Sequence, residues 1–260
     1  MTRLSTLARL ETSATSINGC RLGVLAFGDS ITNGGGELQW GVALQSWALW
    51  VARGLGLPYS GYAADGARMD DVVKDQLAAH RRCAGAGARY DLGCLYIGVN
   101  DVRRLDWDAP QFEEGFRQAL CFVRERCDRV LTVTAPLDLG RPRAGAKVRD
   151  LNAVIERVAA EHHALVLDLR DFGARNLVMA DHVHPTAFGQ IAIAHRALYV
   201  LARDGLRVLV WPSSMIRYET TWWRRLRADC TYSYRHLKVS ARALALTARV
   251  SLPAPRSPRG

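Results

Sequence analysis

The stretch Val24–Gly34, which reads VLAFGDSITNG, organises the rest of the chain. Its apolar first half is short and β-prone, so we expect a buried strand over Leu22–Phe27. Glycine, aspartate and asparagine then crowd into a few positions, which is typical of a turn. Ser30 would therefore lie at the carboxyl end of a buried strand, where open α/β sheets bind their ligands. Asp29 or Ser30 could equally cap a following helix, and this stretch alone gives the two interpretations similar weight.

Other predicted strands and helices alternate along the chain. This alternation predicts a parallel sheet covered by helices on both faces, but it does not set the strand order. The further predicted strands are Pro58–Ala63, Asp91–Ile97, Arg129–Ala135 and Ala164–Leu169, and the predicted helices are Trp40–Leu55, Met69–His80, Pro110–Cys127, Lys147–His163 and Thr186–Asp204.

Three further motifs lie just after a predicted strand or just before a predicted helix. Gly66 follows the second strand, Asn100 follows the third, and Asp181 and His184 lie in the loop before the last of these helices. Since the carboxyl ends of parallel strands share one edge of the sheet, these side chains can meet at a single site.

Ser, Gly, Asn and His in this order and spacing resemble the four signature blocks of the SGNH/GDSL hydrolase family, over about residues 21–204. The resemblance implies an α/β fold with three α/β/α layers and a five-stranded parallel sheet in the flavodoxin-like order 2-1-3-4-5. It also implies a catalytic set of Ser30, Asp181 and His184. The implied oxyanion hole consists of the backbone N–H groups of Ser30 and Gly66 and the side-chain amide of Asn100.

The chemistry of these residue types agrees with such roles. A serine hydroxyl is a poor nucleophile unless a base lies within hydrogen-bond reach and a third group holds that base in the right tautomer. His184 is the candidate base, and Asp181, three residues earlier, can reach its Nδ1 atom. A tetrahedral oxyanion needs fixed donors, and an uncharged asparagine amide and a closely approachable glycine backbone both suit that need.

Each of these residues also has a purely structural interpretation. Gly66 could be a turn glycine, Asn100 could form an Asx-turn, and Asp29 is expected to brace its turn. His182 is expected to point away from the site. A metal-binding pair of His182 and His184 lacks a supporting cluster, and the six cysteines show no CxxC spacing, so we expect no metal and no cofactor.

Composition places a basic appendage after the hydrolase-like part. The chain has 260 residues and a net charge of +10, and ten of its arginines and lysines follow Trp211, against Glu219 and Asp229. We expect a flexible arm over 1–20, an SGNH domain over 21–205, and a basic aromatic helical extension over 206–260 with a disordered end.

Two interpretations of this extension compete. It could be an amphipathic helix for an anionic membrane surface or an acidic partner. Alternatively, its aromatic residues pack back on the core and its arginines form a solvated face, which we favour slightly. Nucleic-acid binding is not favoured, because no known module is present. No apolar run is long enough to span a bilayer and the N-terminus lacks a secretion signal, so we expect a cytoplasmic protein.

The sequence thus predicts a serine esterase that forms an acyl-enzyme with a small, carbohydrate-borne or lipid ester. An acyltransferase that uses the same site to acylate a sugar or metabolite hydroxyl is the alternative among enzymes. A binding protein that uses the basic extension is the alternative from another class. Arg68 or Arg103 could hold an anionic substrate group, and the motifs leave the natural substrate, the acyl length, the oligomeric state and the pathway open.

Overall fold

The computed structural model describes residues 21–38, 42–85, 87–140, 144–217 and 221–251. The predicted arm over 1–20 and the predicted disordered end from 252 lie outside these described residues.

A five-stranded sheet forms the centre of the domain, in the order β2-β1-β3-β4-β5. Every neighbouring pair of strands is parallel, so the predicted sheet and the strand order implied by the family resemblance are both confirmed. The strands are β1 (Val24–Gly28), β2 (Tyr59–Gly61), β3 (Tyr90–Tyr96), β4 (Cys127–Val133) and β5 (Leu165–Leu167).

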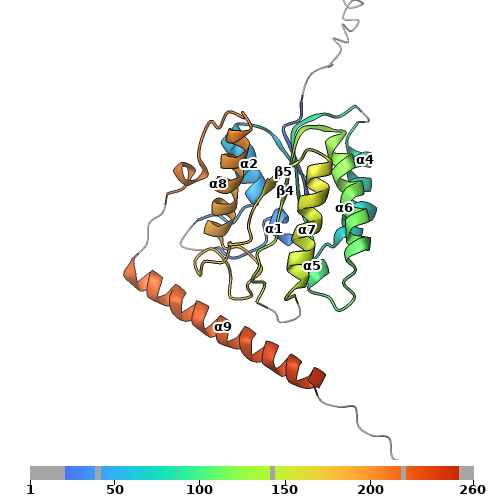
Figure 1. Cartoon of the computed structure of the whole chain (residues 1–260). Coiled ribbons are helices and arrows are strands. Elements are labelled where there is room, and N and C mark those ends of the chain that lie inside the picture. The colour runs from blue at the N-terminus through green and yellow to red at the C-terminus, as the bar shows by residue number, and fades with distance from the viewer. Residues whose placement is uncertain (1–20, 39–41, 86, 141–143, 218–220, 252–260) are drawn as a thin grey trace, which may run out of the picture.

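Helices cover both faces of this sheet, with α2 and α8 on one side and α4, α6 and α7 on the other (Figure 1). The helices of the described residues are α1 (Ser30–Asn33), α2 (Trp47–Leu55), α3 (Met69–Asp71), the π-helical turn η1 (Val72–Gln76), α4 (Leu77–Cys83), α5 (Val99–Val102), α6 (Ala109–Arg124), α7 (Lys147–Glu161), α8 (Ala187–Arg203), the 3₁₀ turn η2 (Pro212–Met215) and α9 (Trp222–Ser251).

The helix predicted to start at Trp40 begins only at Trp47. Ser46 caps it, because its side chain accepts a hydrogen bond from the backbone N–H of Ala48 at 3.2 Å. The apolar residues before Ser46 match the helical period without being helical. Cys127, predicted in a helix, instead opens β4.

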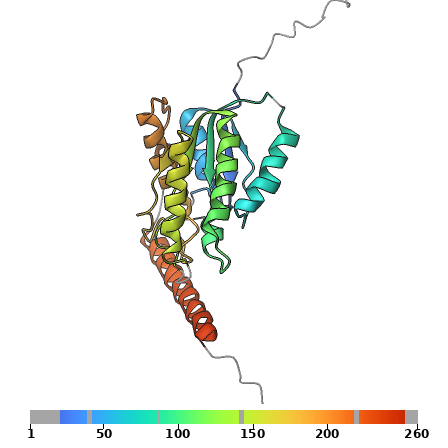
Figure 2. The same cartoon turned by 45° about the vertical axis from the view of Figure 1, so that its right-hand side comes forward.

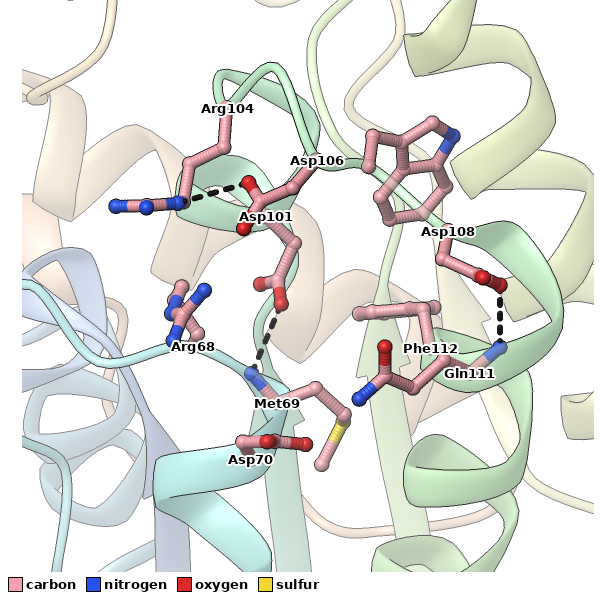
Figure 3. Close-up of a pocket in the computed structure, with 10 residues that line it drawn as sticks. Arg68, Met69, Asp70, Asp101, Arg104, Asp106, Asp108, Gln111 and Phe112 are labelled. Carbon is pink, nitrogen blue, oxygen red and sulfur yellow. Dashed lines mark hydrogen bonds and ion pairs between the residues drawn. The ribbon is translucent and has the colours of Figure 1, made fainter.

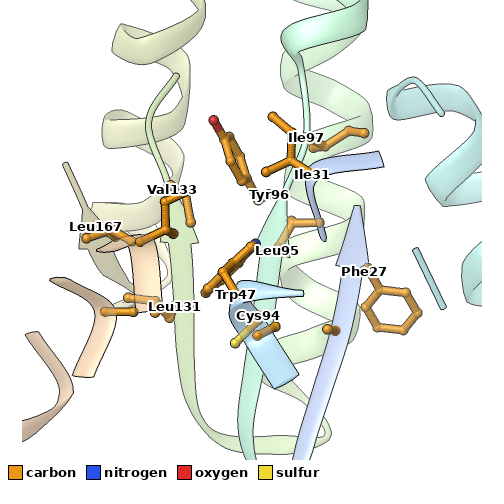
Figure 4. Packing of buried hydrophobic residues seen from close by; sticks show 14 of the residues in the cluster. Phe27, Ile31, Trp47, Cys94, Leu95, Tyr96, Ile97, Leu131, Val133 and Leu167 are labelled. Carbon is orange, nitrogen blue, oxygen red and sulfur yellow. The ribbon is translucent and has the colours of Figure 1, made fainter. Parts of the chain in front are cut away.

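The central strands are mostly apolar and buried, since they are covered on both faces, and their charged residues Asp91, Asp128 and Arg129 lie near the amino ends of β3 and β4. Phe27, Leu95 and Leu131 are fully buried, and Trp47 of α2 packs into the same core with no exposed surface (Figure 4). This core fixes the strand ends from which the loops with Ser30 and Asn100 emerge, so the sheet sets the position of these residues.

Three buried carboxamides join helices to backbone groups near the carboxyl edge of the sheet. Gln76 accepts a hydrogen bond from the N–H of Gly28 at 3.0 Å and donates to its carbonyl at 2.8 Å. Asn152 of α7 makes the same pair of bonds with Ala135, at 2.8 and 2.9 Å. Each side chain therefore supplies the hydrogen bonds that a further strand would have made.

The third carboxamide, Gln190 of α8, holds the loop that follows β1. Its Nε2 atom donates to the carbonyls of Ile31 and Gly35, at 2.9 and 3.1 Å. Its Oε1 atom accepts from the N–H of Trp47 at 2.8 Å. One glutamine thus ties the loop after β1, the start of α2 and the start of α8 together.

The chain after α8 stays on the domain before it leaves as α9. Leu206, Val208 and Met215 pack against the core, and the N–H groups of Leu209 and Val210 both donate to the Gly54 carbonyl, at 2.8 and 3.1 Å. We therefore propose that the packed unit extends beyond the boundary predicted at residue 205.

Helix α9 then crosses one end of the domain (Figures 1 and 2). Tyr232 meets the domain, with the Arg175 guanidinium 5.0 Å from its ring centre. Trp222, Trp223 and Tyr234 are largely exposed, so the prediction that the aromatic residues pack back on the core is wrong for these three. None of the helices in the described ranges combines the length and the apolar character that a membrane span requires.

Replacing Gln76 by leucine should destabilise the fold. The Gly28 carbonyl keeps a bond from the Ala64 N–H at 3.2 Å, but the buried Gly28 N–H loses its acceptor. A buried group without a partner costs about 1–3 kcal/mol, so we expect Gln76→Leu to lower the free energy of unfolding in urea by that amount. Gln118→Leu on the exposed side of α6 is the control, with an expected change within about 0.5 kcal/mol. Equal effects of the two variants would contradict the assigned role of Gln76.

Candidate active site

Ser30 is the first residue of α1 and lies directly after β1. The strand can turn here because Gly28 has φ +152° and a Cβ at this position would lie 2.3 Å from the Tyr96 carbonyl oxygen. Asp29 is the N-cap of α1 and accepts a hydrogen bond from the Ile31 N–H at 2.9 Å. Burial raises the pKa of Asp29 to about 7. Asp29 thus braces the turn, as expected, while Ser30 remains 8% exposed.

His184 and Asp181 extend from Ser30 in one hydrogen-bonded line. The Oγ atom of Ser30 lies 2.9 Å from Nε2 of His184. Nδ1 of the same ring lies 2.6 Å from Oδ2 of Asp181. The other carboxylate oxygen of Asp181 accepts from the backbone N–H groups of Val183 and His184, at 2.9 and 3.0 Å. The aspartate is therefore held by both oxygens and in turn holds the imidazole.

The electrostatics of this pair favour a histidine that is protonated at Nδ1. Burial would raise the pKa of Asp181, but the hydrogen bonds from the His184 ring and from the two amides outweigh it and lower the pKa to about 2. The hydrogen bond to Asp181 raises the pKa of His184, against the opposing effect of burial. In the neutral ring, Nδ1–H faces the carboxylate and the Nε2 lone pair faces the Ser30 hydroxyl.

Asn100 and Gly66 lie on neighbouring loops at the same edge of the sheet. Asn100, in α5, donates one N–H of its side-chain amide to the Ala67 carbonyl at 3.0 Å, which fixes the amide and leaves its second N–H available. Gly66 is exposed, has φ +74°, and has no atom within 4 Å of the position of a Cβ. Among the described residues, no group accepts a hydrogen bond from its backbone N–H. Both loops can therefore offer donors to a bound group.

Asp101 strengthens the link between these two loops. Its Oδ1 atom accepts from the Met69 N–H at 3.1 Å, next to the Asn100–Ala67 bond. Burial raises the pKa of Asp101 to about 6. Asp101 thus anchors the chain segment that follows Gly66.

A cavity of about 230 Å³ lies beside this link and is lined by Arg68, Asp101 and Arg104 together with Trp107 and Phe112 (Figure 3). Its wall also includes three further aspartates, Asp70, Asp106 and Asp108. Arg104 is paired with Asp106 at 3.0 Å. The carboxylates outnumber the guanidinium groups, so the cavity does not favour the predicted use of Arg68 in holding an anionic group.

His182 turns away from the site. It has φ +59°, its Nδ1 lies 3.3 Å from Oδ2 of Asp138, and its ring centre is 5.4 Å from that of His236 in α9. The prediction that His182 points elsewhere is confirmed. Within the described ranges, no three His, Cys, Asp or Glu side chains are placed as a metal site would require.

The three buried carboxamides, of which Gln76 and Gln190 hold the chain on either side of Ser30, are absent from the sequence predictions. Gln190 stands between Gly189 and Ile191 in an otherwise apolar helical stretch, and Gln76 stands directly before the buried Leu77. A polar amide at a position where the helical period requires an apolar residue is the signal that could have found them.

Solved structures with the same fold include several ester hydrolases. A member of the lipolytic G-D-S-L family from Veillonella parvula is 23% identical, with 70% of this chain and 98% of that chain covered and a TM-score of 0.56. A lipase/acylhydrolase from Enterococcus faecalis is 21% identical, with 78% and 100% covered and a TM-score of 0.54. An acetylxylan esterase from Geobacillus stearothermophilus is 20% identical, with 70% and 96% covered and a TM-score of 0.53.

The comparison with curated proteins found no match. The model of the GDSL-like lipase/acylhydrolase family, by contrast, matches residues 26–191, which include Ser30, Gly66, Asn100, Asp181 and His184. The four signature blocks, the strand order and this match agree, and the chain belongs to the GDSL-like lipase/acylhydrolase family.

Proposed function

We propose that this protein hydrolyses carboxylic esters through an acyl-enzyme on Ser30. The observation that carries the proposal is the hydrogen-bonded line from the Ser30 Oγ to His184 Nε2 at 2.9 Å and from His184 Nδ1 to Asp181 at 2.6 Å. Membership of the GDSL-like lipase/acylhydrolase family supports this chemistry independently of the geometry.

In the first half-reaction, the Ser30 oxygen attacks the ester carbonyl carbon while His184 Nε2 takes the hydroxyl proton. Asp181 stabilises the resulting imidazolium and keeps the ring oriented. The C–O bond to the alcohol then breaks, and the leaving alkoxide takes the proton from Nε2. In the second half-reaction, His184 Nε2 takes a proton from the water that attacks the acyl carbonyl carbon. The bond from that carbon to Ser30 Oγ then breaks, Nε2 returns the proton to Oγ, and the carboxylic acid leaves.

The tetrahedral intermediates carry a negative oxygen that needs donors. We assign this role to the backbone N–H groups of Ser30 and Gly66 and to the side-chain N–H of Asn100 that Ala67 does not use. One preorganised donor of this kind is worth about 3 kcal/mol of transition-state stabilisation. The Asn100–Ala67 and Asp101–Met69 bonds support the assignment, because they hold two of the three donors in a fixed arrangement.

The substrate class is a small, carbohydrate-borne or lipid ester. The names of the structural neighbours cover this range, since one is an acetylxylan esterase and another is a lipase/acylhydrolase. Neighbours at this level of identity share the fold, and the choice among these esters depends on surfaces outside the catalytic line.

Ser30→Ala should abolish turnover of p-nitrophenyl acetate and butyrate, because no nucleophile remains. Asn100→Ala should lower kcat by about 10²–10³-fold with a smaller change in KM, because the lost donor acts mainly in the transition state. Steady-state kinetics on both esters measure these effects. Asn176→Ala, which replaces an exposed asparagine, is the control and should retain the wild-type kcat. Turnover by Ser30→Ala at the wild-type rate would refute the proposal, and product transfer to an added alcohol in place of hydrolysis would favour an acyltransferase.

The pH dependence of kcat/KM should report His184. Only the neutral ring can accept the serine proton, so activity rises with pH, and the raised pKa of His184 places the midpoint above its ordinary value of 6.5. Asp181→Asn removes the carboxylate that raises this pKa and should move the midpoint downward and lower the plateau. Asp138→Asn removes the carboxylate beside His182 instead and should leave the midpoint in place. An unchanged midpoint in Asp181→Asn would contradict the assigned pair.

A further inference from the structure

Helix α9 exposes an apolar stripe. At about 3.6 residues per turn, Trp222, Leu226, Cys230 and Leu237 lie on one side of the helix, and Trp223 and Tyr234 lie beside them. The exposed fractions are 62% for Trp222, 64% for Trp223, 45% for Leu226, 66% for Tyr234, 69% for Leu237 and 70% for Leu244. Large apolar side chains that share one helix face and remain this exposed mark an interaction surface.

A different side of α9 is used to dock on the domain. Asp229 pairs with Arg175 at 2.8 Å, and Arg235 pairs with Glu37 at 2.5 Å. The ring of His236 lies against that of His182. These contacts set the rotation of the helix about its own axis, and that rotation turns the apolar stripe away from the domain.

Arginine and lysine residues border the stripe. Arg227, Lys238 and Arg242 lie on a third side of α9, next to the apolar stripe, and all three are exposed. The whole helix carries seven arginines and lysines against one aspartate. Aromatic and apolar side chains next to a basic border are the combination found in helices that lie in the interface of an anionic membrane.

The docking contacts place α9 next to the candidate active site. Glu37 lies on the loop after α1, and its carbonyl accepts from the Ala187 N–H at 2.9 Å, three residues beyond His184. His182, which meets α9, is two residues before His184. Figures 1 and 2 both show α9 at the end of the domain from which these loops project.

Other loops at the carboxyl edge of the sheet also expose leucines. Leu38 is 61% exposed on the loop after α1, Leu105 is 78% exposed after α5, and Leu137 is 46% exposed after β4. These three leucines add exposed apolar side chains to the edge of the sheet that carries Ser30, which is the edge that an ester must approach.

We propose that α9 docks the protein on an anionic membrane surface and that the esters cleaved at Ser30 are held in that membrane. The aromatic and leucine side chains would enter the interfacial region, while Arg227, Lys238 and Arg242 would contact lipid phosphates. The second half of this proposal rests on the proposed esterase function.

The charge of α9 selects a membrane over a second copy of the chain. Two copies that met through their apolar stripes would bring two basic borders together, and like charges repel across such a contact. Anionic lipid headgroups neutralise the same border. Tryptophan and tyrosine side chains, with an apolar ring and a polar tip, also suit the membrane interface.

Vesicle co-sedimentation tests the docking step with the full-length Ser30→Ala variant, which leaves the lipid intact. We expect binding to phosphatidylcholine vesicles that also contain phosphatidylglycerol, much weaker binding to phosphatidylcholine alone, and a loss of binding as salt is raised. No binding to the anionic vesicles at low salt would overturn the proposal.

Matched variants assign the binding to α9. Arg227→Glu, Lys238→Glu and Arg242→Glu together should weaken binding by more than about tenfold. Arg82→Glu, Arg203→Glu and Arg207→Glu together change the net charge equally on exposed positions outside α9 and should have a much smaller effect. The double variant Leu226→Gln, Leu237→Gln should also weaken vesicle binding. Tyr199→Gln, which replaces an exposed side chain of α8, should not. An equal loss of vesicle binding in both charge-reversal triples would overturn the role of α9. The role would also be overturned if Leu226→Gln with Leu237→Gln left vesicle binding unchanged and only converted a dimer to a monomer, as measured by light scattering.

Activity separates the two halves of the proposal. The rate on 4-methylumbelliferyl oleate held in anionic vesicles, divided by the rate on water-soluble 4-methylumbelliferyl acetate, should fall at least about tenfold in the α9 charge-reversal triple. An unchanged ratio of these two rates would overturn the proposal that the substrate is held in the membrane. Vesicle binding without turnover of either ester would refute the esterase function and leave the docking role standing, so the two failures are distinguishable.

Discussion

The hydrogen bond between Ser30 Oγ and His184 Nε2 joins residues 154 positions apart in the chain. The fold has to hold both residues at hydrogen-bond distance. Ser30 is held at the end of a central, fully buried strand. His184 is held by a carboxylate that is itself fixed by two backbone amides. Neither residue could keep this distance on a free loop, because the entropy of two independent loops would oppose it. The parallel sheet is therefore the precondition of the site.

The scaffold around this bond depends on buried amides as much as on apolar packing. Gln190 joins the serine loop to α8, which begins just after His184, through bonds to the Ile31 and Gly35 carbonyls. Gln76 secures the end of β1 in the same way. Such neutral amides satisfy buried backbone groups without bringing a charge into the core.

The parallel sheet could be predicted from the alternation of short apolar runs with helical stretches. The strand order and the set Ser30, Asp181 and His184 came instead from the family resemblance that the four local motifs carry. The role of Gln190 did not, since its partners lie about 150 residues away and no local pattern encodes that contact. The start of α2 was predicted too early because Val42 and Leu44 match the helical period, whereas the Ser46 cap decides the boundary. The sequence left two interpretations of the basic extension open and slightly favoured packing on the core, because amphipathic spacing does not tell which side of a helix meets the domain. The docking pairs Arg175–Asp229 and Glu37–Arg235 settle that orientation.

The most direct test of the account is to locate the acyl group during turnover. Rapid acid quenching of the wild-type enzyme with p-nitrophenyl butyrate, followed by intact-mass measurement and peptide mapping, should show one butyryl group on Ser30 and none in Ser30→Ala. An acyl group on another residue, or ester turnover in Ser30→Ala at the wild-type rate, would contradict the central claim that the Ser30–His184–Asp181 line performs the chemistry.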